Sequence, residues 1–138
     1  MTQQHMPDIQ LPQVAVESMN ATHAEELNLI AGLLRSLEQD DVPGVMQAAT
    51  AFAVHVEEHF AREERLMEQY GFPPYPIHKH EHEQMRPLVA QACANVDTPQ
   101  GREELRRFIE QQFLPWLENH VATMDTATAH FLAMQGVE

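Results

Sequence analysis

Histidines and carboxylates recur at helical spacing in segments that are otherwise rich in apolar residues. In HVEEHFAREE, residues 55–64, His59 and Glu63 are four residues apart, so on an α-helix they lie nearly one above the other. His78 and His82 repeat this spacing in HKHEH. Each pair is compatible with an ordinary solvated i,i+4 contact and with half of a metal site.

The periodicity of the apolar residues indicates which polar side chains face a core. His23 shares a three-and-four rhythm with Leu27, Ile30 and Leu34, as expected for one buried helix face. The apolar periodicity of the four segments places seven polar residues on inward faces: His23, His59, Glu63, His78, His82, His120 and Asp125. The other histidines are expected in solvent: His5, His55, His80 and His130.

So many polar groups in one core require compensating charge. Burying an imidazole without a partner costs a few kcal/mol, and burying a carboxylate costs more. A pair of divalent cations would supply the compensation, and imidazole with carboxylate but no sulfur fits a dinuclear iron centre best. The single Cys93 allows neither an internal disulfide nor a thiolate cluster. His120 and Asp125 are five residues apart, about 140° around an ideal helix, so no simple helical rule pairs them.

Four long helices must position these residues. They are expected over about 18–38, 45–70, 77–96 and 99–134, separated by QDDVPG, GFPPYP and DTPQG. Pro115 lies inside the last helix and predicts a kink there. The fold class is therefore all-α, an antiparallel up-down four-helix bundle over residues 17–138 with an irregular N-terminal arm over 1–16.

Composition excludes several classes of function. The 138 residues, 43% of them hydrophobic, are enough for one domain with a real core. With 21 acidic and 8 basic residues, the net charge of −13 opposes binding to nucleic acid and to anionic membrane surfaces. No apolar run approaches the ~20 residues of a membrane span, and the first residues lack the features of a signal peptide, so a cytoplasmic location is expected.

Two other metal-binding patterns are absent. Ferritin-like diiron proteins carry Glu-x-x-His pairs, but no histidine here has a glutamate three residues before it. The HExxH pattern of zinc proteases is also missing, because HEHEQ, which starts at His80, ends in Gln84.

The motifs in order resemble those of the hemerythrin family of bacterial and invertebrate non-heme diiron proteins. They are NATH with His23, HFAREERLM with His59 and Glu63, HKHEH with His78 and His82, and WLENHVATMD with His120 and Asp125. The resemblance runs from about Met19 to Phe131. It implies two iron ions joined by an oxo or hydroxo group, with O2 bound reversibly at an open position on one of them.

The resemblance also implies a role for each residue. His78, His82 and His120 would hold one iron, His23 and His59 the other, and Glu63 and Asp125 would bridge the pair. Phe60, Trp116 and Leu117 would form the walls of an apolar pocket, in addition to ordinary core packing.

Glu26 departs from the family pattern, which usually has an apolar residue three positions after the first histidine. Its carboxylate would ligate the open iron position, pass protons to bound oxygen species, or turn out to solvent beside Glu25. We expect an O2-binding carrier, store or buffer rather than an enzyme. The alternatives are a redox enzyme that reduces peroxide or nitric oxide, with Glu26 near the open iron, and an oxygen or redox sensor that acts through a separate partner. The sequence does not determine whether a reductase or another protein is a partner, nor what the oligomeric state is.

Overall fold

A computed structural model describes residues 9–138 of the chain. Its helical elements, in chain order, are α1 (Glu17–Glu38), α2 (Val42–Tyr70), α3 (Tyr75–Ala94), α4 (Pro99–Phe108), the π-helical η1 (Ile109–Phe113), α5 (Leu114–His120), the π-helical η2 (Val121–Asp125) and α6 (Thr126–Met134). The described residues contain no β-strand. Among their helices, none combines the length and hydropathy of a membrane span.

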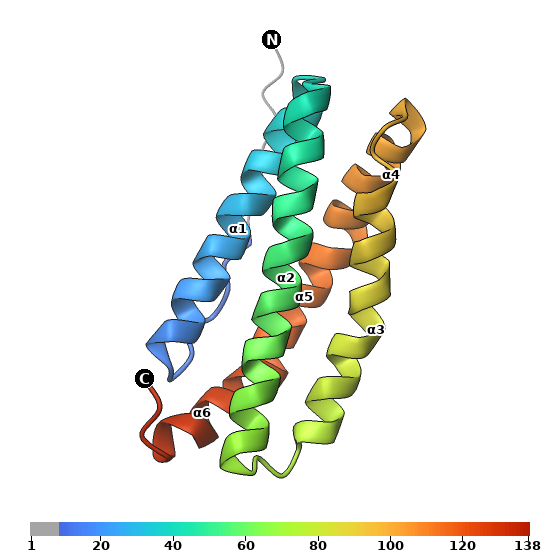
Figure 1. The fold of residues 1–138 in the computed structure, drawn as a ribbon. Helices are drawn as coiled ribbons and strands as arrows, with labels where there is room; N and C mark the ends of the chain where they lie inside the picture. Colours follow the sequence, from blue (N-terminus) through green and yellow to red (C-terminus); the bar gives the residue numbers. More distant parts are fainter. Residues whose placement is uncertain (1–8) are drawn as a thin grey trace.

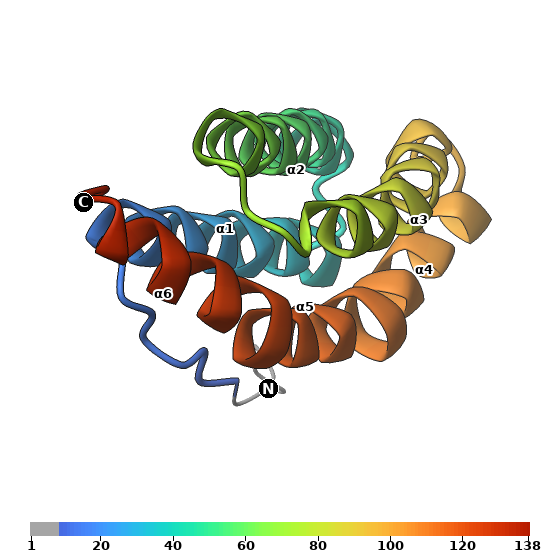
Figure 2. The ribbon, with the colours of Figure 1, turned by 90° about the horizontal axis from the view of Figure 1, so that it is seen from below.

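The elements form four rods that run up and down in turn (Figure 1). The helices α1, α2 and α3 are the first three rods, and α4 to α6 with the two π-helical turns form the fourth. Seen from below, the rods surround a common interior (Figure 2). The predicted all-α four-helix bundle is confirmed.

The helix ends follow local chemistry. The second helix begins at Val42, three residues earlier than predicted, because the Asp41 side chain accepts a hydrogen bond from the Gly44 N–H at 3.1 Å and caps the helix. Its last residue, Tyr70, is followed by Gly71 in the left-handed conformation, with φ of 68°, which ends the helix. The third helix begins at Tyr75 with a proline in its first turn, where the missing N–H has no intrahelical partner to lose.

The fourth rod departs from α-helical geometry on the N-terminal side of Pro115. In η1 the Leu114 N–H bonds to the carbonyl of Ile109, five residues back, and Pro115 then lies in the first turn of α5. A proline in a helix interior removes a backbone hydrogen bond and crowds the preceding turn. Where the sequence predicts a kink at Pro115, the structure has a π-helical turn just before it.

The described part of the predicted N-terminal arm, residues 9–16, has no helix. It is attached to α1 by Asn20, whose side chain accepts from the Val14 N–H at 2.8 Å and donates to the Val14 carbonyl at 3.0 Å. Val16 is fully buried. Residues 1–8 of the arm, with His5, lie outside the described residues.

The core is built in layers along the bundle. One large apolar cluster contains Ile30, Phe52 and Phe113, and a smaller one contains Val16, Met19, Ala129 and Leu132. Between them along α1 lie the buried polar residues His23 and Glu26. The bundle therefore encloses a polar layer between two apolar layers.

Two glycines give a paired test of the packing between α3 and α4. A Cβ on Gly101 would collide with the backbone carbonyl of Asn95, whereas a Cβ on Gly32 meets only the tip of Arg35, at 3.7 Å. We expect Gly101→Ala to lower the free energy of unfolding by about 1–3 kcal/mol through overpacking. Gly32→Ala should raise it by up to about 1 kcal/mol through helix propensity. Urea denaturation of both variants checks this, and equal stabilities would contradict the close contact at Gly101.

Candidate metal centre

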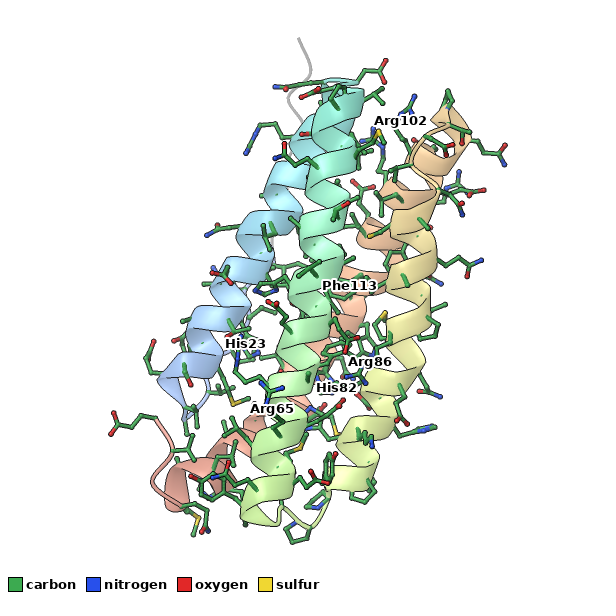
Figure 3. All side chains as sticks on the ribbon, viewed as in Figure 1. His23, Arg65, His82, Arg86, Arg102 and Phe113 are labelled. Atoms are coloured by element: carbon green, nitrogen blue, oxygen red, sulfur yellow. The ribbon has the colours of Figure 1, made fainter. Side chains whose placement is uncertain are left out.

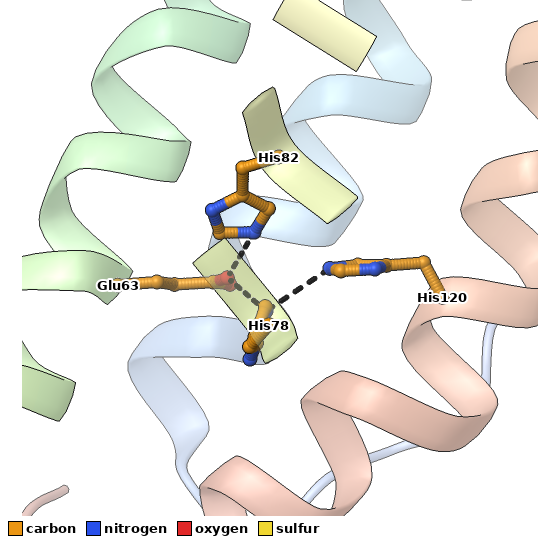
Figure 4. A group of neighbouring side chains, drawn as sticks. All are labelled: Glu63, His78, His82 and His120. Atoms are coloured by element: carbon orange, nitrogen blue, oxygen red, sulfur yellow. Dashed lines mark hydrogen bonds and ion pairs between the residues drawn. The ribbon is translucent and has the colours of Figure 1, made fainter. Parts of the chain in front are cut away.

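All seven polar residues predicted to face inward come together in the polar layer. Each is at most 3% exposed. Their donor atoms form two groups, and within each group they lie within 4.8 Å of one another. The first group is Glu63, His78, His82 and His120 (Figure 4), and the second is His23, His59, Glu63 and Asp125. His23 of α1 and His82 of α3 project toward the interior from opposite sides (Figure 3).

Glu63 faces both sets of histidines. Its Oε2 lies 2.8 Å from Nε2 of His59, and its Oε1 lies 3.3 Å from Nε2 of both His78 and His82. One oxygen is therefore directed toward the two-histidine side of the cluster and the other toward the three-histidine side.

Asp125 does the same from the fourth rod. Its Oδ2 lies 3.0 Å from Nε2 of His23, and its Oδ1 lies 3.2 Å and 3.3 Å from Nε2 of His78 and His120. The two carboxylates together span the two sets of imidazoles, as bridging ligands would.

The π-helical turn η2 allows Asp125 to contact the buried histidines without a break in the helical rod. His120 ends α5 and Asp125 ends η2, five residues later. In a π-helical turn the backbone bonds join residues five apart, so one extra residue fits into the turn. This turn reduces the rotation of about 140° that an ideal α-helix would place between the two side chains. The sequence placed both residues in the core but did not predict this turn.

Four histidines are held from behind by their second ring nitrogen. In each, Nδ1 contacts an oxygen from another helix at 2.8–3.0 Å: His59 with Glu26, His78 with Thr128, His82 with Glu64 and His120 with Glu81. Because a carboxylate can only accept, we assign the ring hydrogen to Nδ1 where Glu26, Glu64 and Glu81 are the partners. With a cation bound, the Nε2 atoms of these rings would carry no hydrogen and would direct their lone pairs inward, as metal-ligating histidines require.

The inner atoms lack the partners that a cation would provide. Within residues 9–138, Glu63 Oε1, His82 Nε2 and Asp125 Oδ1 are buried without a hydrogen bond. The Nε2 atoms of His78 and His120 lie 3.1 Å apart. Two donors at right angles, each about 2.1 Å from one ion, would be about 3.0 Å apart. The spacing and chemistry of the donor set therefore fit bound cations.

The charges of the cluster interact strongly. Burial would lower the pKa of His78, but the adjacent carboxylates of Asp125 and Glu63 raise it to about 9. Burial would raise the pKa of Glu63, but the charge and hydrogen bond of His59 hold it well below its usual range. The carboxylates thus attract positive charge to the imidazoles. Protons and metal ions compete for the same nitrogens, so metal affinity should fall as the pH falls.

Glu26 is fully buried, so the possibility that its side chain turns out to solvent beside Glu25 is wrong. It belongs to neither ligand group found in residues 9–138. Its Oε1 lies 3.0 Å from Nδ1 of His59 and 3.0 Å from Nδ1 of His55. Burial would raise the pKa of Glu26, but charge on His59 and hydrogen bonds from His55 and His59 lower it to about 2.

His55 was expected in solvent, and that expectation is wrong, since its side chain is only 11% exposed and contacts Glu26 and Glu25. His80 and His130 are exposed as predicted. The outer partners Glu64, Glu81 and Thr128 were not identified from the sequence, because each contacts a histidine of another helix. Only the position of Thr128, three residues after Asp125, could have indicated an inward side chain.

The three residues expected as pocket walls lie against the cluster or in its apolar surroundings. Phe60 stacks on His82 with 4.0 Å between ring centroids, and half-buried Trp116 stacks on His120 at 4.4 Å. Leu117 is fully buried in the large apolar cluster. Phe60 and Trp116 thus cover the three-histidine group.

Comparison with known proteins agrees with this geometry. A family model described as the hemerythrin HHE cation binding domain matches residues 14–129. A bacteriohemerythrin of Aquifex aeolicus is 37% identical over 114 residues, which are 83% of this chain and 87% of that relative. A bacteriohemerythrin of Ralstonia nicotianae is 32% identical over 120 residues, which are 85% of this chain and 81% of that relative.

Thr128 provides a test of the outer hydrogen bonds. Thr128→Val removes the hydroxyl 2.8 Å from Nδ1 of His78 while keeping the side-chain shape. We expect metal affinity to fall by about 10-fold or more, the usual effect of losing such a partner. Competition with a chelator measures it. Thr123→Val is the control and should bind as the unmodified chain does, because the exposed Thr123 hydroxyl bonds to the Asn119 carbonyl of its own rod. Equal affinities in the two variants would contradict the role of Thr128.

Proposed function

This chain belongs to the hemerythrin family, and we propose that its buried cluster holds two iron ions at which O2 binds reversibly. The family match and the two ligand groups already support cation binding by the bundle. The identity of the ions, their number and the binding of O2 are the further steps of the proposal.

The proposed ligands follow the two groups of donor atoms. His78, His82 and His120 hold one iron, and His23 and His59 hold the other. Glu63 and Asp125 would bridge the two irons. The observation that carries the assignment is that each carboxylate directs one oxygen to each set of histidines, at 2.8–3.3 Å.

The donor set favours iron and leaves an open position. Imidazole binds iron, copper, zinc and nickel, and carboxylates that bridge two ions without sulfur favour a diiron pair among these. When bound in the ferrous state, such a pair supplies the two electrons that O2 accepts and returns on release. Three histidines on one side and two on the other make the two-histidine side the place for O2.

The protein's own residues keep the cluster dry and oriented. Phe60 and Leu117 are fully buried and Trp116 covers His120, so water has little access from that side. The outer partners of His59, His78, His82 and His120 fix the rings so that each Nε2 points inward.

Reversible O2 binding is favoured over the redox-enzyme alternative by the position of Glu26. An acid that delivers protons to bound oxygen species would face the ions, but Glu26 contacts the far nitrogen of His59. The proposed role is therefore an oxygen carrier, store or buffer. The sensor alternative would require a partner protein that receives the signal, and no observation in residues 9–138 favours one.

Metal analysis tests the diiron proposal. Purified protein should contain two irons per chain, and chelation should lower the melting temperature by roughly 5 °C or more, since ion binding is linked to folding and each 1 kcal/mol shifts Tm by about 2–4 °C in larger domains. Elemental analysis and calorimetry before and after chelation measure both. An unchanged melting curve would mean that the histidines form a self-sufficient core, and zinc as the purified metal would contradict the iron assignment.

O2 binding is tested by spectroscopy. Protein reduced without air should develop a visible charge-transfer band when O2 is admitted and lose it when O2 is removed. Several cycles without loss of amplitude support a carrier. Rapid conversion to a stable ferric form that is slowed by Glu26→Leu would instead support the redox enzyme.

A further inference from the structure

A line of four hydrogen-bonded side chains joins the cluster to the surface between α1 and α2. His59 Nδ1 lies 3.0 Å from Glu26 Oε1, which lies 3.0 Å from His55 Nδ1. The other nitrogen of His55 lies 2.8 Å from Glu25 Oε1. The side chain of Glu25 is 68% exposed, that of His55 11%, and that of Glu26 is fully buried. The line therefore places a buried carboxylate beside the cluster and a histidine between it and the solvent.

Glu26 has the chemistry of a metal ligand but does not occupy a ligand's place. Its Oε2 is buried without a hydrogen-bond partner within residues 9–138. Glu26 lies three residues after His23, hence on nearly the same face of α1. A carboxylate with a spare oxygen thus lies next to His23 and His59, the two histidines proposed to hold the iron with the open position. Its Oε1, however, is bound to two Nδ1 atoms on the outer side of His59.

We propose that His55 is a positioning residue that holds Glu26 behind His59, where Glu26 orients this ring and stays out of the open coordination position. This role rests on the proposed diiron function. His55 suits it because it contacts a carboxylate at each ring nitrogen, Glu26 from one side and Glu25 from the other. Both nitrogens must carry hydrogens to donate to both carboxylates, so the ring is cationic and holds Glu26 by charge as well as by a hydrogen bond.

The arrangement behind His82 repeats the same design with different residues. Glu64 accepts from Nδ1 of His82 and is itself held by Arg86, at 2.9 Å and 3.0 Å. In both places a cationic side chain near the surface fixes the carboxylate that orients a buried imidazole. Arg86 and His55 therefore occupy equivalent places in two separate chains of contacts.

Azide binding to the oxidised protein tests the role of His55, because azide is a small anion that takes an open position on ferric iron. Four proteins are compared: the unmodified chain, His55→Leu, Glu26→Gln and the double variant. In His55→Leu the released carboxylate should enter the open position and weaken azide binding by roughly tenfold, as expected if it occupies that position in about nine molecules of ten. Glu26→Gln and the double variant should both bind azide within about twofold of the unmodified chain, because an amide is a poor competitor.

Two further variants serve as controls. His55→Asn keeps a donor near the place of Nδ1 and should bind azide as the unmodified chain does. His130→Leu removes an exposed histidine of α6 and should have no effect. Unchanged azide affinity in His55→Leu, or a double variant as weak as His55→Leu, would overturn the proposal.

Iron content and circular dichroism separate the possible failures. If the unmodified chain binds neither iron nor azide, the proposed function fails, whereas normal azide binding by all four proteins removes only the role of His55. If His55→Leu does not load iron, loading of the double variant supports the proposal, because removing Glu26 then restores the site. If the double variant also fails to load, His55 is needed for the structure itself and the positioning role is overturned.

Discussion

The burial of seven polar ligand-type side chains in a dry core is the constraint on which the rest of this structure depends. Five imidazoles and two carboxylates lie at most 3% exposed between two apolar clusters. Groups of this kind are stable inside a protein only when their charges and lone pairs are satisfied. Bound cations would satisfy the Nε2 atoms and the unpaired oxygens of Glu63 and Asp125 together. On the proposed function, metal binding and the stability of the bundle would therefore be linked through the same layer.

Helical geometry determines how each rod reaches this layer. In α2 and α3 the four-residue spacing of an α-helix is enough, since His59 and Glu63, or His78 and His82, lie on one face. The fourth rod carries His120 and Asp125 five residues apart, and its backbone changes to a π-helical turn between them. Such turns appear mostly at functional sites, and here the turn has a definite purpose. It brings Asp125 into contact with both sets of histidines.

Periodicity was sufficient to predict the rods and the inner residues but not their surroundings. The four helices and the buried faces of the inner residues follow from where apolar residues repeat, but the contact of Asp125 with the histidines depends on the π-helical turn η2, which periodicity does not predict. The outer partners depend instead on how neighbouring helices are rotated against each other, which a single sequence does not encode in a simple pattern. His55 illustrates this limit: it misses the apolar stripe of its own helix, yet it is covered by glutamates of α1. Glu26 likewise depends on a neighbouring helix: two histidines of α2, His55 and His59, contact its buried carboxylate and compensate its charge.

Several of the acidic residues that give the chain its net charge of −13 have a specific role beside the buried histidines. Glu26, Glu64 and Glu81 each accept from a ring nitrogen of a buried histidine, which makes these imidazoles stronger donors toward a cation. His78 differs, because its partner is the neutral hydroxyl of Thr128, which in turn lies 3.8 Å from the sulfur of Met67. The histidines of one group are therefore unequal donors. A ring with a neutral partner gains less electron density, so the contacts behind the histidines, and not only the number of histidines, would determine how strongly each proposed ion is held.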